Sequence, residues 1–235
     1  MEISIVIPAF NEEKRIGGTV RRFLSYLQQN FRQYELIVVD DGSVDKTQDV
    51  LKAITQERAE VRIFRNQTNS GKGHAVKQGV LQAEGVLVFF ADADLSTPPE
   101  EIKHFADLFK TSSASVLIGS RNVAGADIKT TQPLYRRVLG RIFNACVRQI
   151  TGLSFKDTQC GFKGFRREAA HEIFKRTTEN RFSFDVEVLL IAKKMGYEIK
   201  EIPIVWSNDS ESKINPVRDG LKMLLDLFMI KQKCK

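Results

Sequence analysis

Two carboxylates, Asp92 and Asp94, come directly after the apolar segment 87–91. Alternate residues that leave a strand can direct two carboxylates at one hard cation, and Mg²⁺ or Mn²⁺ prefers oxygen ligands together with substrate phosphates. Pro98 and Pro99 also allow a simpler interpretation, an acidic turn before a helix. We predict that the pair binds a divalent metal ion, because other acidic residues follow strand-like segments in the same way.

Asp40 and Asp41 form a second acidic pair, after the strand-like segment 35–39 and before Gly42. An Asp-Gly turn followed by a helix cap accounts for one of these carboxylates but not for both. Carboxylates accept hydrogen bonds from ring N–H and hydroxyl groups. The predicted use of this pair is therefore a contact with a nucleoside, with Asp41 the stronger candidate.

The glycine-rich segment 69–73 precedes a helix-like stretch and superficially resembles a phosphate loop. It is not a Walker motif, because Asn66 stands where the first glycine belongs and Gly73 replaces Ser or Thr. The first strand leads to residues 8–11 (Pro-Ala-Phe-Asn), so the dinucleotide fingerprint is missing as well. The segment still suits an anion at a helix start, whereas a nicotinamide enzyme is disfavoured.

Strand-like and helix-like segments alternate in the first half of the chain, which predicts a doubly wound α/β sheet. Several strands are almost continuously apolar, as in a parallel sheet covered on both faces. Ligands bind beyond the carboxyl ends of such strands, so four adjacent loops are expected to gather the acidic groups and Arg121 at one rim. The predicted strands are 3–7, 35–39, 61–64, 86–91 and 116–119, and the predicted helices are 15–29, 46–58, 72–83 and 100–110.

The second half is less regular, but it contains no repeat and no low-complexity linker, so we expect a single domain over residues 1–235. Its predicted elements are helices 134–151, 167–176, 185–195 and 217–230, a polar turn at 156–161 and a strand at 199–206.

The composition is that of a globular protein: of 235 residues, 42% are hydrophobic and 28% are charged, which excludes a disordered tail or a fibrous repeat. The net charge of +7 is compatible with nucleic acid, an anionic membrane or phosphorylated substrates. An RNA-binding sheet is disfavoured, because interleaved aromatic and basic residues are missing. Three cysteines without C-x-x-C spacing argue against a disulfide framework or a zinc site and indicate a reducing cytosol.

The helix-like segments 134–151 and 217–230 are amphipathic and basic. The only charged residues of the first are Arg136, Arg137, Arg141 and Arg148. Such helices suit an anionic membrane interface, although a core-packed helix with a solvated face gives the same periodicity. No apolar run reaches the roughly 18 residues that span a bilayer. We therefore expect a peripheral protein on the cytoplasmic face of a membrane.

Four motifs in about the first 120 residues resemble, in order and spacing, the inverting GT-A glycosyltransferases of family 2. They are residues 8–12 (PAFNE), 40–45 (DDGSVD), 69–73 (NSGKG) and 92–95 (DADL). Motifs of the second half resemble polyprenyl-phosphate sugar transferases, in particular the dolichyl-phosphate β-glucosyltransferase type, with the mannosyl type as a near neighbour. They are residues 119–121 (GSR), 157–163 (DTQCGFK), Arg181 with 184–187 (FDVE), and 212–213 (SK).

This resemblance implies a GT-A fold, a Rossmann-like doubly wound mixed sheet flanked by helices. Residues 1–125 would bind a nucleotide sugar, and residues 126–235 would face the acceptor and the membrane. The implied activity is metal-dependent, with Mg²⁺ or Mn²⁺, and moves glucose from UDP-glucose to a polyprenyl phosphate with inversion. An integral-membrane protein is compatible as a recruiting partner.

Two alternatives to this activity stay open. GDP-mannose is an alternative donor, because no residue of this sequence separates uracil from guanine. A glycan hydroxyl is an alternative acceptor, although the Q-x-x-R-W motif typical of such enzymes is absent. A phosphate acceptor needs no catalytic base, because its second pKa of about 6 leaves it largely ionised at pH 7.

The same resemblance implies roles for individual residues. Catalysis, through the metal ion and through neutralisation of the phosphates, is expected of Asp94, Arg121 and Lys213. The nucleotide-sugar site is expected to comprise Pro8, Ala9, Asn11, Glu12, Asp40, Asp41, Lys72, Asp92, Ala93, Asp94 and Gln159. The acceptor phosphate is expected to meet Arg121, Arg136 and Arg137. Four more residues are expected to position the sugar or to brace these arginines, or else to form structural hydrogen bonds. They are Asp157, Gln159, Asp185 and Glu187.

Overall fold

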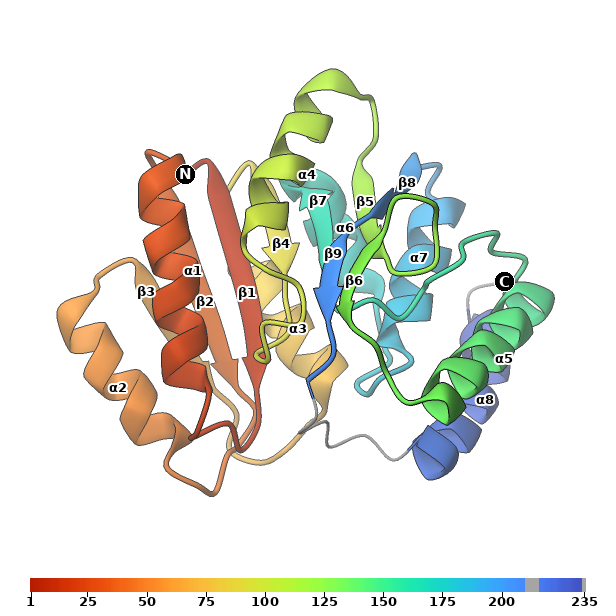
Figure 1. Ribbon diagram of the computed structural model, residues 1–235, viewed down its shortest axis with the longest axis horizontal. Helices are drawn as coiled ribbons and strands as arrows, with labels where there is room; N and C mark the ends of the chain where they lie inside the picture. The colour runs from red at the N-terminus through yellow and green to blue at the C-terminus, as the bar shows by residue number, and fades with distance from the viewer. Residues whose placement is uncertain (210–215, 234–235) are drawn as a thin grey trace.

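The computed structural model of the chain describes residues 1–209 and 216–233 and shows a mixed sheet flanked by helices (Figure 1). Its strands are β1 (Ile3–Ala9), β2 (Tyr34–Asp40), β3 (Val61–Arg65), β4 (Leu87–Phe90), β5 (Val116–Ser120), β6 (Asp127–Thr130), β7 (Lys163–Arg166), β8 (Ile199–Pro203) and β9 (Val205–Ser207). Its helices are α1 (Ile16–Asn30), α2 (Thr47–Glu57), α3 (Lys72–Leu81), α4 (Glu100–Thr111), α5 (Leu134–Thr151), α6 (Arg167–Arg176), α7 (Phe184–Lys194) and α8 (Pro216–Lys233).

Within the described residues, seven strands form one sheet in the order β3-β2-β1-β4-β7-β5-β8. Neighbouring strands are parallel, except that β7 is antiparallel to β4 and to β5. The chain runs outward from β1 to β3 and then returns through α3 to β4, on the other side of β1. The strand order therefore reverses between β1 and β4, and open α/β sheets bind ligands at such a switch point.

The sheet is covered on both faces, because side chains of a strand alternate in direction with a period of two. In β1, Ile5 and Ile7 join the apolar cluster under α1, α2 and α4, whereas Val6 joins the cluster under α3, α6 and α7. All three side chains are fully buried. Burying each contributes about 1.5–3 kcal/mol. This burial fixes the register of β1, and with it the position of the loop that follows.

The strands and helices predicted for the first half are confirmed, with ends that shift by a few residues. The pattern does not predict β7, because Lys163 and Arg166 make its sequence polar; Lys163 is nevertheless fully buried. β7 lies between β4 and β5, so these two strands are not neighbours in the sheet, but residues of the loops after both strands still border one cavity. The predicted strand 199–206 is interrupted after Pro203, and β9 pairs with β6 in a separate two-stranded sheet.

α5 and α8 lie side by side at one end of the molecule, away from α1 and α2 (Figure 1). Asn144 and Val147 are the buried residues of α5, and Leu227 and Ile230 of α8 reach the cluster under α7. Most of the amphipathic stripe of α5 therefore stays accessible. In the described ranges, none of the helices combines the length and the hydropathy needed to cross a bilayer.

Candidate active site

A first cavity, of about 260 Å³, lies at the switch point, beyond the carboxyl ends of β1 and β4. It is bordered by the loops after β1 and β4, the start of α3 and the loop before α7. Its lining includes Pro8, Ala9, Phe10, Glu12, Arg15, Asp41, Asn69, Gly71, Lys72, Asp92, Ala93, Asp94, Arg181 and Phe182. Predicted site residues from four separate motifs thus meet in one cavity.

The turn after β4 directs the Asp94 carboxylate. Ser96 donates its backbone N–H to Oδ1 of Asp94 at 2.9 Å, and Leu95 between them has a φ of +56°. Thr19 of α1 holds this turn by donating its hydroxyl to the carbonyl oxygen of the residue before Asp94 at 2.6 Å. A positive φ is strained for leucine, and strain of this kind is concentrated at functional sites. Burial and the negative charge of Asp92 raise the pKa of Asp94.

Asp92 is held between Lys72 and Gly161. The ammonium of Lys72 lies 2.6 Å from Oδ1 of Asp92. Burial opposes the charge of Lys72, but the carboxylates around it, Asp92 first and then Asp185, together raise the pKa of Lys72. On the other side, a Cβ built on Gly161 would stand 1.9 Å from Oδ2 of Asp92. No residue larger than glycine fits at position 161 unless this carboxylate moves.

The donor set at this point fits a divalent metal ion that completes its coordination with substrate. Asp92 and Asp94 both border the cavity, and burial together with the charge of Asp92 raises the pKa of Asp94, even though Lys72 lies beside Asp92. No group of three or more His, Cys, Asp or Glu side chains is arranged to hold a metal in the described part of the chain. Mg²⁺ commonly uses one or two carboxylates together with phosphate oxygens, which is what this pair offers.

Asp41 organises the loop at the start of α3. Its Oδ1 accepts from Nδ2 of Asn66 at 2.7 Å and from the backbone N–H of Ser70 at 2.9 Å. Its Oδ2 accepts the backbone N–H of Gly71 at 2.7 Å. Gly71 has a φ of +108°, and a Cβ there would stand 2.3 Å from the carbonyl oxygen of Asn180. Asp41 borders the cavity as predicted, but it uses most of its acceptor capacity to shape the cavity wall.

Arg15 connects the loop after β1 with the segment after β9. Its guanidinium pairs with Glu12, at 2.9 Å between Nη2 and Oε1, and also with Asp209. The hydrogen bond to Glu12 leads the contacts that raise the pKa of Arg15, against the effect of burial. No motif marks Arg15 as a site residue, although an arginine three residues after a glutamate at a helix start is a recognisable signal for such a pair.

A second cavity, of about 420 Å³, adjoins the first and shares Lys72, Asp92, Asp94 and Phe182 with it. Its other polar residues include Ser96, Arg121, Gln132, Arg136, Gln159, Asp185, Asn208 and Asp209. Its apolar wall includes Leu139, Ile142 and Phe143 of α5 and Leu221, Met223 and Leu224 of α8. The combination suits an amphiphilic ligand with a charged head and an apolar tail.

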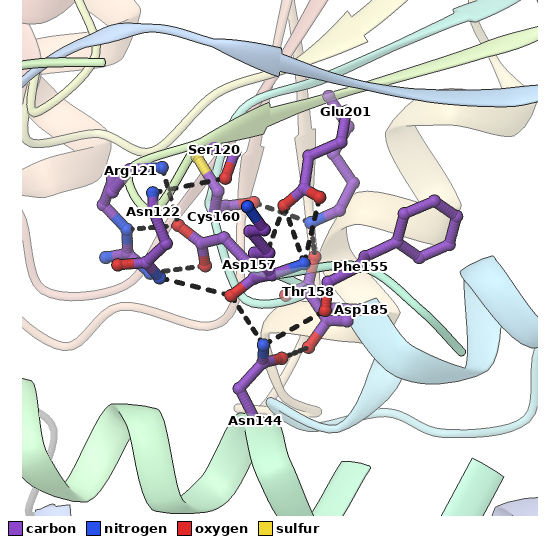
Figure 2. A network of polar contacts seen from close by, with 12 residues as sticks. Ser120, Arg121, Asn122, Asn144, Phe155, Asp157, Thr158, Cys160, Asp185 and Glu201 are labelled. Atoms are coloured by element: carbon purple, nitrogen blue, oxygen red, sulfur yellow. Dashed lines mark hydrogen bonds and ion pairs between the residues drawn. The ribbon is translucent and has the colours of Figure 1, made fainter. Parts of the chain in front are cut away.

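The Arg121 guanidinium, at the polar side of the second cavity, is fixed by Asp157 (Figure 2). Asp157 accepts from Nε of Arg121 at 2.7 Å, from Nη2 at 2.9 Å and from the backbone N–H at 3.0 Å. The Trp206 ring centroid lies 5.3 Å from the guanidinium carbon. Burial alone would raise the pKa of Asp157, but the charge and hydrogen bonds of Arg121 lower it. With 25% of its side chain exposed, Arg121 meets a ligand in an orientation set beforehand.

The loop that carries Asp157 is attached to two other elements (Figure 2). Glu201 of β8 accepts the backbone N–H of Asp157 at 2.7 Å. Asn144 of α5 accepts the hydroxyl of Thr158 at 3.1 Å and donates to two carbonyl groups of the same loop. The orientation of Arg121 therefore depends on both the sheet and α5.

Asp185 and Glu187 of α7 support the site. Asp185 borders the second cavity but pairs with Lys163, which is fully buried. Burial raises the pKa of Asp185, although the charge of Lys163 opposes this effect. Glu187 accepts hydrogen bonds from two backbone N–H groups of the loop before α7, at 2.9 and 2.8 Å. It therefore forms structural hydrogen bonds, which was one of the two roles expected for it.

The structure brings most of the predicted residues to these cavities but not all of them. Asp40 borders neither: its carboxylate is fully buried and accepts the backbone N–H of Ser43 at 2.9 Å, so that it holds the turn. Asn11 and Arg137 also lie outside the linings of both cavities. Lys213 lies outside the described residues.

Gln159 and Trp206 lie on the polar side of the second cavity. Nε2 of Gln159 is buried and has no hydrogen-bond partner among the residues that the structure describes. Such a nitrogen is free to donate to a hydroxyl or phosphate oxygen of a ligand. No sequence pattern marks Trp206, because its role comes from stacking against Arg121 rather than from a motif.

Comparison with known proteins agrees with this geometry. The family model "Glycosyl transferase family 2" matches residues 4–174. Dolichyl-phosphate beta-glucosyltransferases of Drosophila melanogaster and Homo sapiens are 35% and 34% identical to the chain. Each alignment covers 98% of this chain, and the alignments cover 74% and 75% of those two proteins, respectively.

Solved structures with the same fold are also found. Glucosyl-3-phosphoglycerate synthase from Mycobacterium tuberculosis, in complex with Mn²⁺, UDP-glucose and phosphoglyceric acid, matches with a TM-score of 0.72 at 19% identity. The match covers 99% of this chain and 79% of that one. This likeness confirms the predicted fold class.

Replacement of Gly161 by alanine tests the position of Asp92. The added Cβ is expected to displace the carboxylate and to weaken Mn²⁺ binding in the presence of UDP by about 10- to 100-fold, the usual cost of disturbing the support of a metal ligand. Calorimetric titration measures the affinity. Gly18→Ala on α1 is the matched control, because a Cβ there meets nothing within 4 Å. A native melting temperature with unchanged Mn²⁺ affinity in Gly161→Ala would refute the constraint.

Replacement of Asp157 by asparagine tests the Arg121 pair. We expect the free energy of unfolding to fall by about 3 kcal/mol, the low end for a broken buried pair, because Arg121 is partly exposed. The pKa of Asp157 is lower in the folded chain than when unfolded, so its contribution is full above about pH 4 and is lost as the pH falls further. Urea unfolding at several pH values measures this difference, with Asp49→Asn, at an exposed aspartate of α2, as control. If the difference in unfolding free energy between the wild type and Asp157→Asn stayed constant well below pH 4, the Asp157–Arg121 pair would not be its source.

Proposed function

The chain belongs to glycosyl transferase family 2, and we propose that it transfers glucose from UDP-glucose to a dolichyl-type polyprenyl phosphate. Its relatives named above are dolichyl-phosphate beta-glucosyltransferases that match nearly the whole chain. One observation carries the proposal: the cavity at the switch point and the second cavity, with its apolar wall from α5 and α8, meet at Asp92 and Asp94.

The first cavity is the proposed site of the nucleotide. Glu12 and Asp41 border this cavity alone, whereas Asp92 and Asp94 border both cavities. A nucleotide in the first cavity would therefore present its diphosphate and sugar to the two shared carboxylates. Mg²⁺ or Mn²⁺ held by this pair would supply positive charge where the departing diphosphate gains negative charge. Lys72, fixed beside Asp92, adds a second cation at the same place.

The second cavity is the proposed site of the lipid phosphate. Arg121 presents a fixed guanidinium and Arg136 a second one, while the apolar side chains of α5 and α8 face the polyprenyl chain. In the reaction, a phosphate oxygen forms a bond to the anomeric carbon while the bond from that carbon to UDP breaks on the opposite face, so the configuration inverts. The acceptor is already largely a dianion near pH 7 and gives up no proton.

The carboxylates around the second cavity favour a phosphate acceptor over a glycan hydroxyl. A hydroxyl acceptor needs a base, and Asp157 and Asp185 are the candidates for that role. Asp157 is paired with Arg121, which lowers its pKa and makes it a weaker base. Asp185 is paired with the buried Lys163. Both carboxylates serve to hold cations in place, which matches the needs of an anionic acceptor.

The outer faces of α5 and α8 are the proposed contact with the membrane. Large apolar side chains that are exposed on these two helices are Leu134, Tyr135, Val138, Ile142, Leu221, Leu225, Phe228 and Met229. Exposed apolar patches of this kind mark interaction surfaces, and the same helices form the apolar wall of the second cavity. A lipid acceptor would thus reach Arg121 without leaving an apolar environment. The cytoplasmic face is proposed, because Cys146 and Cys160 are free thiols.

A donor panel tests the activity. With Mn²⁺ or Mg²⁺ and detergent-dispersed polyprenyl phosphate, radiolabel from UDP-glucose is expected in the lipid, and GDP-mannose is expected to give little product. Asp94→Ala should lower the rate by about 10²–10³-fold with an unchanged melting temperature, since it removes a group that holds positive charge at the leaving diphosphate. Preferred transfer of mannose, or transfer of glucose to soluble sugars alone, would overturn the proposal.

Vesicle flotation tests the membrane face. The double substitution Leu225→Ser/Phe228→Ser is expected to weaken binding at least tenfold, because burying each of these side chains in an interface contributes about 1.5–3 kcal/mol. The matched control is Val44→Ser/Val86→Ser, which removes two exposed apolar side chains from distant loops. Equal binding by both double variants would rule out this face. Neither residue of the test pair borders a cavity, so activity in detergent should stay unchanged.

A further inference from the structure

A third cavity, of about 660 Å³, lies between α5, β6 and the loop that carries Asp157. The cations that border it are Arg121, Arg136, Arg137, Arg141, Arg148 and Lys156. Asp157 is the one acid of this lining among the described residues, and it is paired with Arg121. Five of the six cations therefore have no acid beside them in this lining. None of these five forms an ion pair with an acidic side chain in the described ranges.

The third cavity adjoins the second and shares Arg121, Arg136 and Gln159 with it, among other residues, but it does not reach the two carboxylates of the reacting centre. Asp92 and Asp94 border the first and second cavities but not the third. Arg137, Arg141 and Arg148 border the third cavity but not the second. An anion held by these three arginines would lie on the side of the third cavity that does not border Asp92 and Asp94. Five like charges around one cavity repel each other, and an anionic ligand removes that repulsion.

These arginines also stand next to the proposed membrane face. Arg137, Arg141 and Arg148 are spaced by four and seven residues, which places them along one side of α5. The exposed Val138 and Ile142 each follow one of them by a single residue, so they lie on the neighbouring side of the helix. Cations at the rim of an apolar helix face match the headgroup level of an anionic membrane.

We propose that the third cavity is a binding site for the phosphate of an anionic glycerophospholipid, distinct from the acceptor site. The volume lies within the range of small-molecule sites and exceeds what a phosphate group alone needs. The phosphate would lie among Arg137, Arg141 and Arg148, and the acyl chains would lie along the exposed side of α5. The inference rests on the membrane attachment in the proposed function, and it adds a specific headgroup site to a general apolar contact.

The test compares two double variants of the full chain, each of which removes two positive charges. Arg141→Gln/Arg148→Gln changes the third cavity, whereas Lys222→Gln/Lys231→Gln changes exposed lysines of α8. Binding is measured by flotation with phosphatidylcholine vesicles that contain or lack phosphatidylglycerol. We expect the affinity of Arg141→Gln/Arg148→Gln, the α5 variant, for the anionic vesicles to fall roughly 30-fold, because each positive charge near an anionic membrane contributes about 1 kcal/mol. We expect the α8 variant to lose clearly less.

Competition separates a lipid headgroup from free phosphate. Glycerophosphate is expected to displace wild-type protein from anionic vesicles and to have little effect on the α5 variant. Equal losses in the two variants would show diffuse attraction only, and would overturn the site. Binding of inorganic phosphate to the cavity without any preference for anionic vesicles would overturn the lipid assignment.

Activity in detergent distinguishes this inference from the proposed function. Glucose transfer to detergent-dispersed polyprenyl phosphate is expected to keep its wild-type KM for the acceptor in Arg141→Gln/Arg148→Gln. A large rise of that KM would show that the cavity holds the acceptor phosphate, and would overturn the separate site. If the wild-type chain transfers no glucose at all, the proposed function fails while the vesicle measurements still decide the headgroup site.

Discussion

The close approach of Gly161 to Asp92 is the constraint on which the site depends. It joins the end of β4 to the loop before β7, and it leaves the Asp92 carboxylate no room except toward Lys72 and the cavity. The same loop carries Asp157, which fixes Arg121. One loop therefore sets both the acidic pair that faces the donor and the guanidinium that faces the acceptor. Its attachments to α5 and β8 keep these two sets of charges in a constant relation, as catalysis by preorganised electrostatics requires.

Both cavities carry acids and cations, but the two key charged groups, the Asp92–Asp94 pair and Arg121, are balanced differently. Asp92 and Asp94 stand close together although this raises the pKa of Asp94, which is unfavourable without a cation. Arg121 is instead given its own carboxylate, so it stays charged and oriented in a buried setting. Two carboxylates with one lysine beside them, and an arginine already balanced by its own carboxylate, suit different partners, namely a metal-bound diphosphate and a lipid phosphate.

Sequence patterns predicted the first-half elements and the residues after β1 and β4, because apolar periodicity fixes strands and the carboxyl ends of parallel strands share one edge. They ranked Asp41 above Asp40 but placed both in the site, since only the packed turn shows that Asp41 meets the cavity whereas Asp40 is buried beneath it. They also missed β7, whose Lys163 is buried only because Asp185 lies opposite. Pairs between distant segments leave no local pattern to find.

The composition of α5 is unfavourable in water but favourable at an anionic membrane surface. Its buried face holds the Asp157 loop through Asn144, and its other faces carry exposed apolar side chains and arginines that form no ion pair within residues 1–209 and 216–233. In water the apolar side chains forgo burial and the arginines repel each other, so this composition weakens the folded state. At a membrane with anionic lipids the apolar side chains are buried and the arginines are attracted to the lipid headgroups, so both become favourable. The Asn144 face stays in contact with the loop. The helix that contacts the lipid is then also the helix that supports Arg121, so membrane attachment and acceptor binding depend on the same element.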